Sequence, residues 1–251
     1  MITGAGDSVG RIIAERCVNN GHRVHICDIS ESAVTNTISE NKNGMLRGTV
    51  ADVSVAKDVE KLFHDALEWM DGIDILVNIA ALGGPRACVE DINYDEWHDV
   101  VNVNLSGAFY CAKQVVPVMK QQKHGVIINF SSCSAKLAPP LRTPYVASKA
   151  AIEALTRCLA RELGPHNIRC NAIVPGAINN QRLNAVLQRN ASARGIGVEE
   201  MKKEMLGYVS LRRVIEMNEF ADLVLFLSSL EAAGITGQVI ELGGNVEWED
   251  S

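Results

Sequence analysis

The stretch TGAGDSVGR, residues 3–11, places three glycines and a serine between a short apolar start and a helical pattern. Ile12, Ile13, Ala14 and Cys17 are the apolar positions of that helix. Glycines at a strand-to-helix turn let the backbone approach a pyrophosphate, and the free N–H groups of a helix N-terminus bind anions. The stretch therefore predicts a phosphate-binding turn, with an ordinary glycine-rich turn as the alternative.

Further apolar runs alternate with helical patterns along the rest of the chain. They cover residues 23–28, 48–52, 73–78, 125–131, 168–174 and 238–242. These runs are too uniformly apolar to face water, and residues 59–70 carry apolar side chains at helical spacing. Alternating strands and helices predict parallel pairing with helices on both faces. We expect an α/β fold, a doubly wound parallel sheet of about seven strands, with ligands at the carboxyl ends of the strands.

The bulk composition is typical of a soluble globular protein, with 251 residues, 47% of them hydrophobic and 22% charged. A net charge of −6 argues against a nucleic-acid-binding surface, which needs clustered Lys and Arg. The sequence shows neither a signal peptide nor an apolar run long enough to span a membrane. Seven cysteines without a C-x-x-C pair or metal-ligand spacing predict free thiols in a reducing compartment and no bound metal. We expect one cytoplasmic domain over residues 1–251.

Asp28 ends the run at residues 23–28, about 20 residues after the glycine turn, where dinucleotide-binding folds place an acid. A carboxylate at this point binds the adenosine ribose hydroxyls and repels a 2′-phosphate. No Arg or Lys lies between Thr3 and Gly10 to attract such a phosphate. The pattern favours NAD(H) over NADP(H). The alternative for Asp28 is an acid at a helix N-terminus, a role that Ser30 would also serve.

Several further motifs follow in order along the chain. They are ADV (51–53), NIAA (78–81), VNLSG (103–107), NFSSCS (129–134), YVASK (145–149), VPGAI (174–178) and ITGQVIELGGN (235–245). With TGAGDSVG, which resembles T-G-x-x-x-G-x-G, they make the chain similar to the short-chain dehydrogenase/reductase family in its compact form of about 250 residues. The resemblance covers essentially the whole length and implies a Rossmann-type single domain.

The family's catalytic positions correspond to Asn104, Ser132, Tyr145 and Lys149. Tyr145 lies one helical turn before Lys149, so an ammonium group would stand beside the phenol and stabilise a phenolate that acts as general acid and base. By resemblance, Lys149 also binds the nicotinamide ribose, Ser132 holds the substrate oxygen, and Asn104 anchors a water that relays protons from Lys149. The implied cofactor contacts are Gly4, Gly6, Ser8, Val9, Gly10, Asp28, Ile29, Asp52, Val53, Asn78, Ala80, Tyr145, Lys149, Pro175, Gly176 and Ile178.

These residues predict an NAD(H)-dependent oxidoreductase that interconverts a secondary alcohol and a ketone by hydride transfer. A nicotinamide-bound isomerase, epimerase or dehydratase is one alternative, and a non-catalytic NAD-sensing protein is another. Arg86, Arg142 and Arg182 fall in segments that contact substrate in the family, so an anionic substrate is a hypothesis, with surface or interface arginines as its alternative. The helix after Tyr145 is apolar around more than one face, which suggests a homotetramer, or a dimer.

The chain departs from the family pattern at a few positions. Ser8 replaces the middle glycine, Ile79 and Ala81 replace the usual Asn and Gly, and Asn180 replaces the usual Thr after the P-G turn. Only Met1 and Ile2 precede Thr3, where the family has a full apolar strand. A shortened strand in the middle of a sheet leaves neighbouring backbone groups unpaired. We therefore expect the natural protein to have several more N-terminal residues, or an incorrectly assigned start.

Overall fold

The computed structural model describes residues 1–41 and 43–247, which form a seven-stranded parallel sheet in the order β3-β2-β1-β4-β5-β6-β7. The order reverses between β1 and β4, as in a doubly wound fold. The expected fold class is confirmed. The strands are β1 (Ile2–Thr3), β2 (Val24–Asp28), β3 (Leu46–Val50), β4 (Ile75–Asn78), β5 (Gly125–Phe130), β6 (Ile168–Pro175) and β7 (Val239–Leu242).

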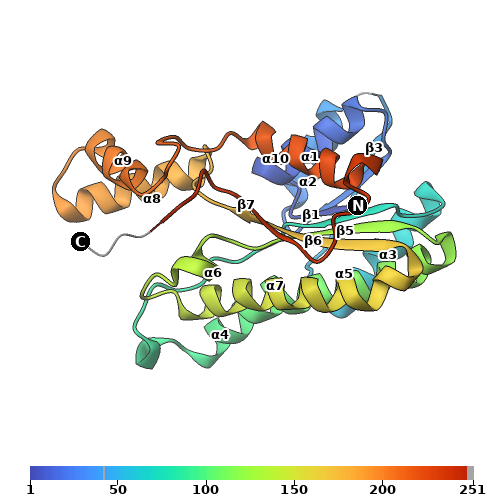
Figure 1. Ribbon diagram of the computed structural model, residues 1–251, viewed down its shortest axis with the longest axis horizontal. Coiled ribbons are helices and arrows are strands. Elements are labelled where there is room, and N and C mark those ends of the chain that lie inside the picture. Colours follow the sequence, from blue (N-terminus) through green and yellow to red (C-terminus); the bar gives the residue numbers. More distant parts are fainter. Residues whose placement is uncertain (42, 248–251) are drawn as a thin grey trace.

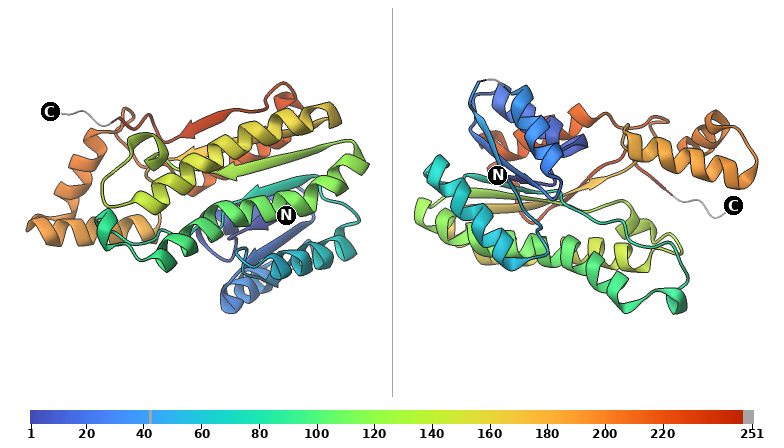
Figure 2. Two further views of the ribbon diagram at one scale, coloured as in Figure 1. Left: turned by 90° about the horizontal axis from the view of Figure 1, so that it is seen from below. Right: turned by 180° about the vertical axis from the view of Figure 1, so that it is seen from behind.

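Helices cover both faces of this sheet (Figure 1). On one face lie α1 (Ser8–Asn19), α2 (Glu31–Glu40) and α10 (Met217–Ser228). On the other lie α3 (Ala56–Met70), α4 (Tyr94–Val101), α5 (Gly107–Gln122) and α7 (Thr143–Leu163), and Figure 2 shows α3, α5 and α7 running side by side. The short α6 (Ser134–Leu137) follows β5. The pair α8 (Gln181–Arg194) and α9 (Val198–Gly207) stands out from the sheet beyond β6.

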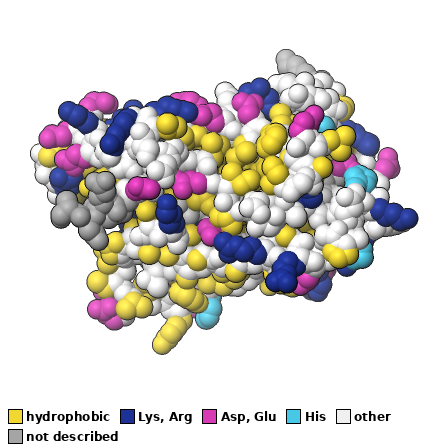
Figure 3. All heavy atoms as spheres, viewed as in Figure 1, with side chains coloured by type: hydrophobic (Ala, Val, Ile, Leu, Met, Phe, Trp, Pro, Cys, Tyr) yellow, Lys and Arg dark blue, Asp and Glu magenta, His cyan; other side chains and the backbone are white. Residues whose placement is uncertain are grey.

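The hydrophobic side chains that the periodicity places on one face of α3 do face the core. Val59, Leu62, Phe63 and Ala66 are fully or almost fully buried, and they pack with Ile127 of β5. A second cluster on the opposite face of the sheet joins α1 and α10. Within residues 1–41 and 43–247, no helix is both long and apolar enough to cross a membrane. On the face shown in Figure 3, basic and acidic side chains are mixed and form no continuous basic surface.

The first strand, β1, contains two residues but occupies the middle of the sheet. Ile2 pairs with Ile26 of β2 and with Val77 of β4. The Met1 ammonium group donates a hydrogen bond to Ile75 O at 3.0 Å, and burial lowers the pKa of this group to about 6. A cavity of about 120 Å³ lies beside Met1, between β2 and β4. The expectation that further residues precede Met1 stays a prediction.

Candidate active site

The predicted site residues come together at one edge of the sheet. Apart from Tyr145 and Lys149, the predicted cofactor residues lie at or after the carboxyl ends of β1, β2, β3, β4 and β6, and Ser132 follows β5. Tyr145 and Lys149 lie in the first two turns of α7, which has Pro144 in its first turn, a position that suits the fixed φ of proline. Parallel strands bring their carboxyl ends to the same edge, so residues far apart in the sequence form one site.

The three glycines of the turn lie where there is no room for a side chain. Gly4 has a left-handed φ of 62°, and a Cβ atom there would lie 2.7 Å from Ala80 Cα. A Cβ atom at Gly10 would lie 2.4 Å from Gly4 O, and one at Gly6 would lie 2.7 Å from Ala33 Cβ. The glycines therefore bring bare backbone to the N-terminus of α1, the arrangement that binds a pyrophosphate. The Val9 side chain is buried in the core, so only the backbone of Val9 can serve a phosphate.

Two of the departures from the family pattern contact one another. Ser8 has a left-handed φ of 49°, which glycine would adopt without strain. Its Oγ accepts a hydrogen bond from Asn180 Nδ2 at 3.3 Å. The Oδ1 atom of Asn180 accepts one from Leu183 N at 2.9 Å and so caps the N-terminus of α8. Ser8 and Asn180 thus join the glycine turn to the start of α8.

Asp28 supports the glycine turn from the end of β2. Its Oδ2 accepts a hydrogen bond from Gly6 N and its Oδ1 accepts one from Ser30 N, both at 3.1 Å. Ser30, not Asp28, is the N-cap of α2, because its side chain accepts from Ala33 N. A carboxylate oxygen accepts more than one hydrogen bond, so Asp28 keeps acceptor capacity for ribose hydroxyls. Beside it, the Ile29 side chain is 70% exposed.

Buried polar side chains connect the strands beneath the site. Asn78 Nδ2 donates to Asn129 Oδ1 at 2.9 Å, and Asn129 Nδ2 donates to Thr156 Oγ1 of α7 at 2.9 Å. Asn78 Oδ1 is buried and has no hydrogen-bond partner in the described part of the chain. Thr3 Oγ1 accepts from the backbone N–H groups of residues 79 and 80. Sequence reasoning missed Asn129 and Thr156; the available signal was a polar residue inside the apolar run at 125–131.

Asn104 lies in a π-helical turn (Asn102–Ser106) between α4 and α5. Such turns often mark functional sites. Asn104 Oδ1 accepts from Leu82 N at 2.7 Å, while Nδ2 donates to Leu82 O at 3.0 Å and to Ser148 Oγ at 2.9 Å. The amide therefore holds the loop after β4 against α7. Both of its N–H groups are engaged, which leaves only oxygen acceptors of Asn104 to hold a water.

Lys149 is buried, with its Nζ atom donating to Phe130 O at 2.7 Å. Burial lowers the pKa of the Lys149 ammonium to about 7, and the positive charge of Arg182 adds to this effect. Nζ lies 5.9 Å from the centroid of the Tyr145 ring. A cavity of about 10 Å³ lined by Lys149, Asn104 and Asn78 is just large enough for one water molecule.

The Tyr145 ring is half-buried and has a second cation on it. The Arg142 guanidinium carbon lies 4.6 Å from the ring centroid. Ser132 is buried, and its Oγ accepts from Ser134 N at 3.2 Å, in the turn that leads into α6. Tyr145, Lys149 and Arg142 thus form one contact group at the start of α7.

A dinucleotide cofactor fits this edge of the sheet. The close-packed glycines of the turn suit a pyrophosphate, and the Asp28 carboxylate, which contacts the turn through Gly6 N, keeps acceptor capacity for ribose hydroxyls. Asn78 Oδ1 is a buried acceptor without a partner among residues 1–41 and 43–247. Gly176, after β6, also packs closely, because a Cβ atom there would lie 2.6 Å from Gly243 Cα. Close-packed glycine backbone therefore follows β1 and also follows β6 at this edge of the sheet.

Comparison with known proteins agrees with this geometry. A family model described as enoyl-(acyl carrier protein) reductase matches residues 4–244. The short-chain reductase protein NovJ of Streptomyces niveus is 34% identical over 97% of this chain and 92% of its own. NAD+-bound xylitol dehydrogenase superimposes with a TM-score of 0.90 at 30% identity, covering 97% and 96% of the two chains. Actinorhodin polyketide ketoreductase with NADPH gives a TM-score of 0.90 at 29% identity, covering 97% and 95%. The chain belongs to the short-chain dehydrogenase/reductase family and is an oxidoreductase of that type.

Proposed function

We propose that the protein is an NAD(H)-dependent oxidoreductase that interconverts a secondary alcohol and a ketone, with Tyr145 as the general acid and base. One observation carries the proposal. The buried ammonium group of Lys149 stands 5.9 Å from the Tyr145 ring centroid, at the edge of the sheet where the glycine turn and Asp28 also lie. Burying a cation without an acid partner is costly, so its position beside a phenol supports a role in proton transfer.

A dinucleotide held at this edge of the sheet would supply or accept the hydride through its nicotinamide ring. During reduction the Tyr145 hydroxyl donates a proton to the carbonyl oxygen, and during oxidation its phenolate takes the proton of the alcohol. Lys149 stabilises that phenolate, and a pKa of about 7 lets its amine release and regain a proton near neutrality. Ser132 donates a hydrogen bond to the substrate oxygen. A water between Lys149 and an oxygen of Asn104 completes the relay.

Charge at the adenosine end supports NAD(H) over NADP(H). The Asp28 carboxylate would repel a 2′-phosphate. Asp7, the exposed N-cap of α1, adds a second negative charge at a position where a cation would attract that phosphate. Solved relatives are divided, since the xylitol dehydrogenase structure holds NAD+ and the actinorhodin ketoreductase structure holds NADPH. The choice therefore rests on the acidic residues of this chain.

The proposal is tested with a panel of secondary alcohols and ketones, both nicotinamide cofactors, and Tyr145→Phe beside the parent protein. We expect a net change in reduced-nicotinamide absorbance with NAD(H) and at least one substrate, lost in the variant. Turnover of a substrate without net cofactor change would indicate an isomerase or dehydratase. Cofactor binding without turnover across the panel would indicate a sensor. Undiminished turnover by Tyr145→Phe would remove the role of Tyr145.

Assembly and location are part of the same proposal. One face of α7 exposes Ala150, Ala154 and Cys158, which lets another helix approach closely, so we propose a homotetramer, or a dimer. The seven free cysteines support a reducing, cytoplasmic setting. The single seven-stranded sheet supports one domain over residues 1–251. Sedimentation analysis of the purified protein tests the assembly, and a monomer at all concentrations would contradict it.

A further inference from the structure

Four arginines from three segments gather beside Tyr145. Arg86 lies in the loop after β4, Arg142 precedes α7, and Arg182 and Arg189 lie seven residues apart on α8. The Nη2 atoms of Arg182 and Arg142 lie 2.8 Å and 3.8 Å from the point where a Cβ atom on Gly83 would stand. The two guanidinium groups therefore lie beside the same residue, Gly83, which follows the Leu82 backbone that Asn104 holds. Arg189 was not predicted; its spacing of two helical turns from Arg182 was the available signal.

The four cations influence one another. Burial, with the charges of Arg189 and Arg182, lowers the pKa of Arg86. Burial, with Arg86 as the largest neighbouring charge, lowers the pKa of Arg142 as well. The charge of Arg182 also reaches Lys149. The cluster joins the proton-transfer group through Arg142, whose guanidinium carbon lies 4.6 Å from the centroid of the Tyr145 ring.

None of the four arginines has a carboxylate partner in the part of the chain that the structure describes, although other arginines do. Arg11 pairs with Glu15 and Glu40, and Arg213 pairs with Glu219. The chain carries 30 Asp and Glu against 24 Lys and Arg, so acidic partners are available in the sequence. Like charges held together without a counterion destabilise a fold. A ligand that brings negative charge would remove that cost.

We propose that Arg142 and Arg182, with the charges of Arg86 and Arg189 near them, bind an oxyanion of the substrate, a phosphate or carboxylate group carried near the reacting carbon. The proposal rests on the proposed function and narrows its substrate class to anionic hydroxy or keto compounds. Guanidinium groups bind such oxyanions through paired hydrogen bonds. Because Arg142 lies on the Tyr145 ring, a substrate anion bound to Arg142 would place the neighbouring hydroxyl or carbonyl group of the substrate near the phenol.

The test compares matched substrates that differ in charge: a hydroxy acid with its methyl ester, and a polyol phosphate with the free polyol. The variants are Arg142→Gln and Arg182→Gln. The matched control is Arg194→Gln, since Arg194 lies on the same helix but is paired with Glu204. We expect each cluster variant to lose about ten- to hundredfold more in kcat/KM on the anionic member of a substrate pair than on the neutral member, mainly through KM. The control should match the parent protein.

A binding measurement separates this inference from the proposed function. Inorganic phosphate and succinate are titrated calorimetrically into the NAD-saturated protein at constant ionic strength. Binding to the parent protein but not to Arg182→Gln supports the anion site, even if no substrate is turned over. Equal turnover of neutral and charged substrates, unaffected by the variants, overturns the site and leaves the dehydrogenase intact. If Arg182→Gln weakened NAD binding as much as it weakened phosphate binding, Arg182 would be a cofactor-binding residue, and the proposal would also be overturned.

Discussion

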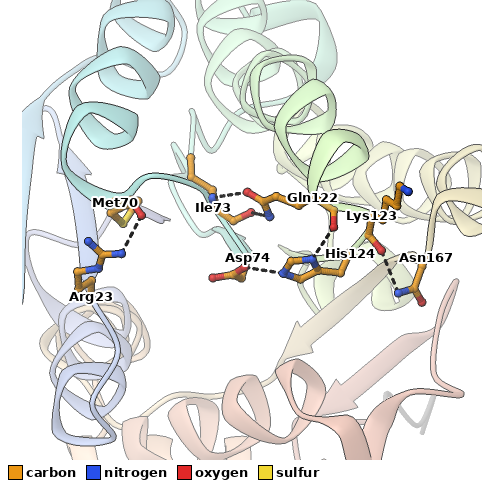
Figure 4. Close-up of polar contacts among 8 residues, drawn as sticks. All are labelled: Arg23, Met70, Ile73, Asp74, Gln122, Lys123, His124 and Asn167. Atoms are coloured by element: carbon orange, nitrogen blue, oxygen red, sulfur yellow. Dashed lines mark hydrogen bonds and ion pairs between the residues drawn. The ribbon is translucent and has the colours of Figure 1, made fainter.

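The amino and carboxyl ends of the sheet differ in how far their polar groups are paired within the protein. At the amino end, shown in Figure 4, polar side chains form hydrogen bonds with backbone groups and side chains of the neighbouring loops. Gln122 accepts from Ile73 N at 2.9 Å and donates to Ile73 O at 3.2 Å, and His124 pairs with Asp74 at 2.8 Å. At the carboxyl end, Asn78 Oδ1 has no partner in the described residues, and the arginine cluster has no carboxylate. The amino-terminal half of β2 has one exception to this contrast, since the buried Nδ1 atom of His25 also has no partner in the described residues.

This difference distinguishes polar groups that stabilise the fold from polar groups that are available to a ligand. A polar group that is paired within the protein stabilises the fold, whereas a buried group left without a partner costs free energy unless a ligand completes it. Proteins accept such a cost at sites that bind or react. Substitutions at the carboxyl end should therefore reduce activity more than stability, and substitutions at the amino end should do the reverse.

The largest effect is expected at Lys149. Lys149→Met should lower kcat/KM by about a hundredfold to ten-thousandfold, the usual contribution of a proton-transfer system. Because burial disfavours the ammonium form, the unfolding free energy of the ligand-free variant should fall by no more than about 1 kcal/mol. Steady-state kinetics and urea unfolding measure the two quantities. Full activity, or a loss of stability as large as the loss of activity, would contradict the comparison.

Asp28 and Asp74 form a matched pair of acids at opposite ends of the sheet. Asp28→Ala should weaken NAD binding about ten- to hundredfold, because it removes the charged acceptor to which the ribose hydroxyls would donate, and it should reduce the preference for NAD over NADP. Asp74→Ala should leave both affinities unchanged. Fluorescence titration with each reduced cofactor measures them. Equal effects of the two substitutions would show that Asp28 acts on the fold alone.

Gln122 provides the reverse case. Gln122→Ala removes both hydrogen bonds to Ile73 and leaves its buried backbone groups unpaired, so the unfolding free energy should fall by about 1 to 3 kcal/mol. NAD affinity and kcat/KM of the folded variant should stay within about twofold, because the site is at the other end of the strands. A variant of normal stability with reduced turnover would overturn the assignment of this end as structural.

The smallest effect is expected at His124. The carbonyl of Gln122 and the carboxylate of Asp74 raise the pKa of His124 above its ordinary value of 6.5. The pair therefore adds stability that is fully present below pH 6.5 and is lost as the pH rises through the higher folded value. His124 is 54% exposed, so the contribution is below about 1 kcal/mol. Urea unfolding of His124→Gln at a series of pH values should show no such decline in the unfolding free energy.

Local patterns predicted the elements well. The glycine turn and the apolar runs predicted the strand positions to within about two residues, and β1 to β7 are all parallel. The Y-x-x-x-K spacing predicted that Tyr145 and Lys149 would lie near one another on a helix. These features depend on residues close together in the sequence, where periodicity and helix geometry determine the arrangement.

Contacts between distant segments could not be predicted in the same way. The Ser8–Asn180 hydrogen bond joins residues 172 positions apart, and the link from Asn129 to Thr156 depends on how α7 crosses β5. The convergence of Arg142 and Arg182 on Gly83 depends on the direction in which α8 leaves the sheet. Strand order and helix placement decide such contacts, and one sequence does not specify them residue by residue.

The most direct test of the central claim is a crystal structure of the protein with NAD. The account predicts the adenosine ribose hydroxyls on the Asp28 carboxylate, the pyrophosphate against residues 4–10, and the nicotinamide ribose within hydrogen-bonding distance of Lys149 Nζ. A dinucleotide bound in the cavity beside Met1, or elsewhere away from the carboxyl ends of the strands, would contradict it.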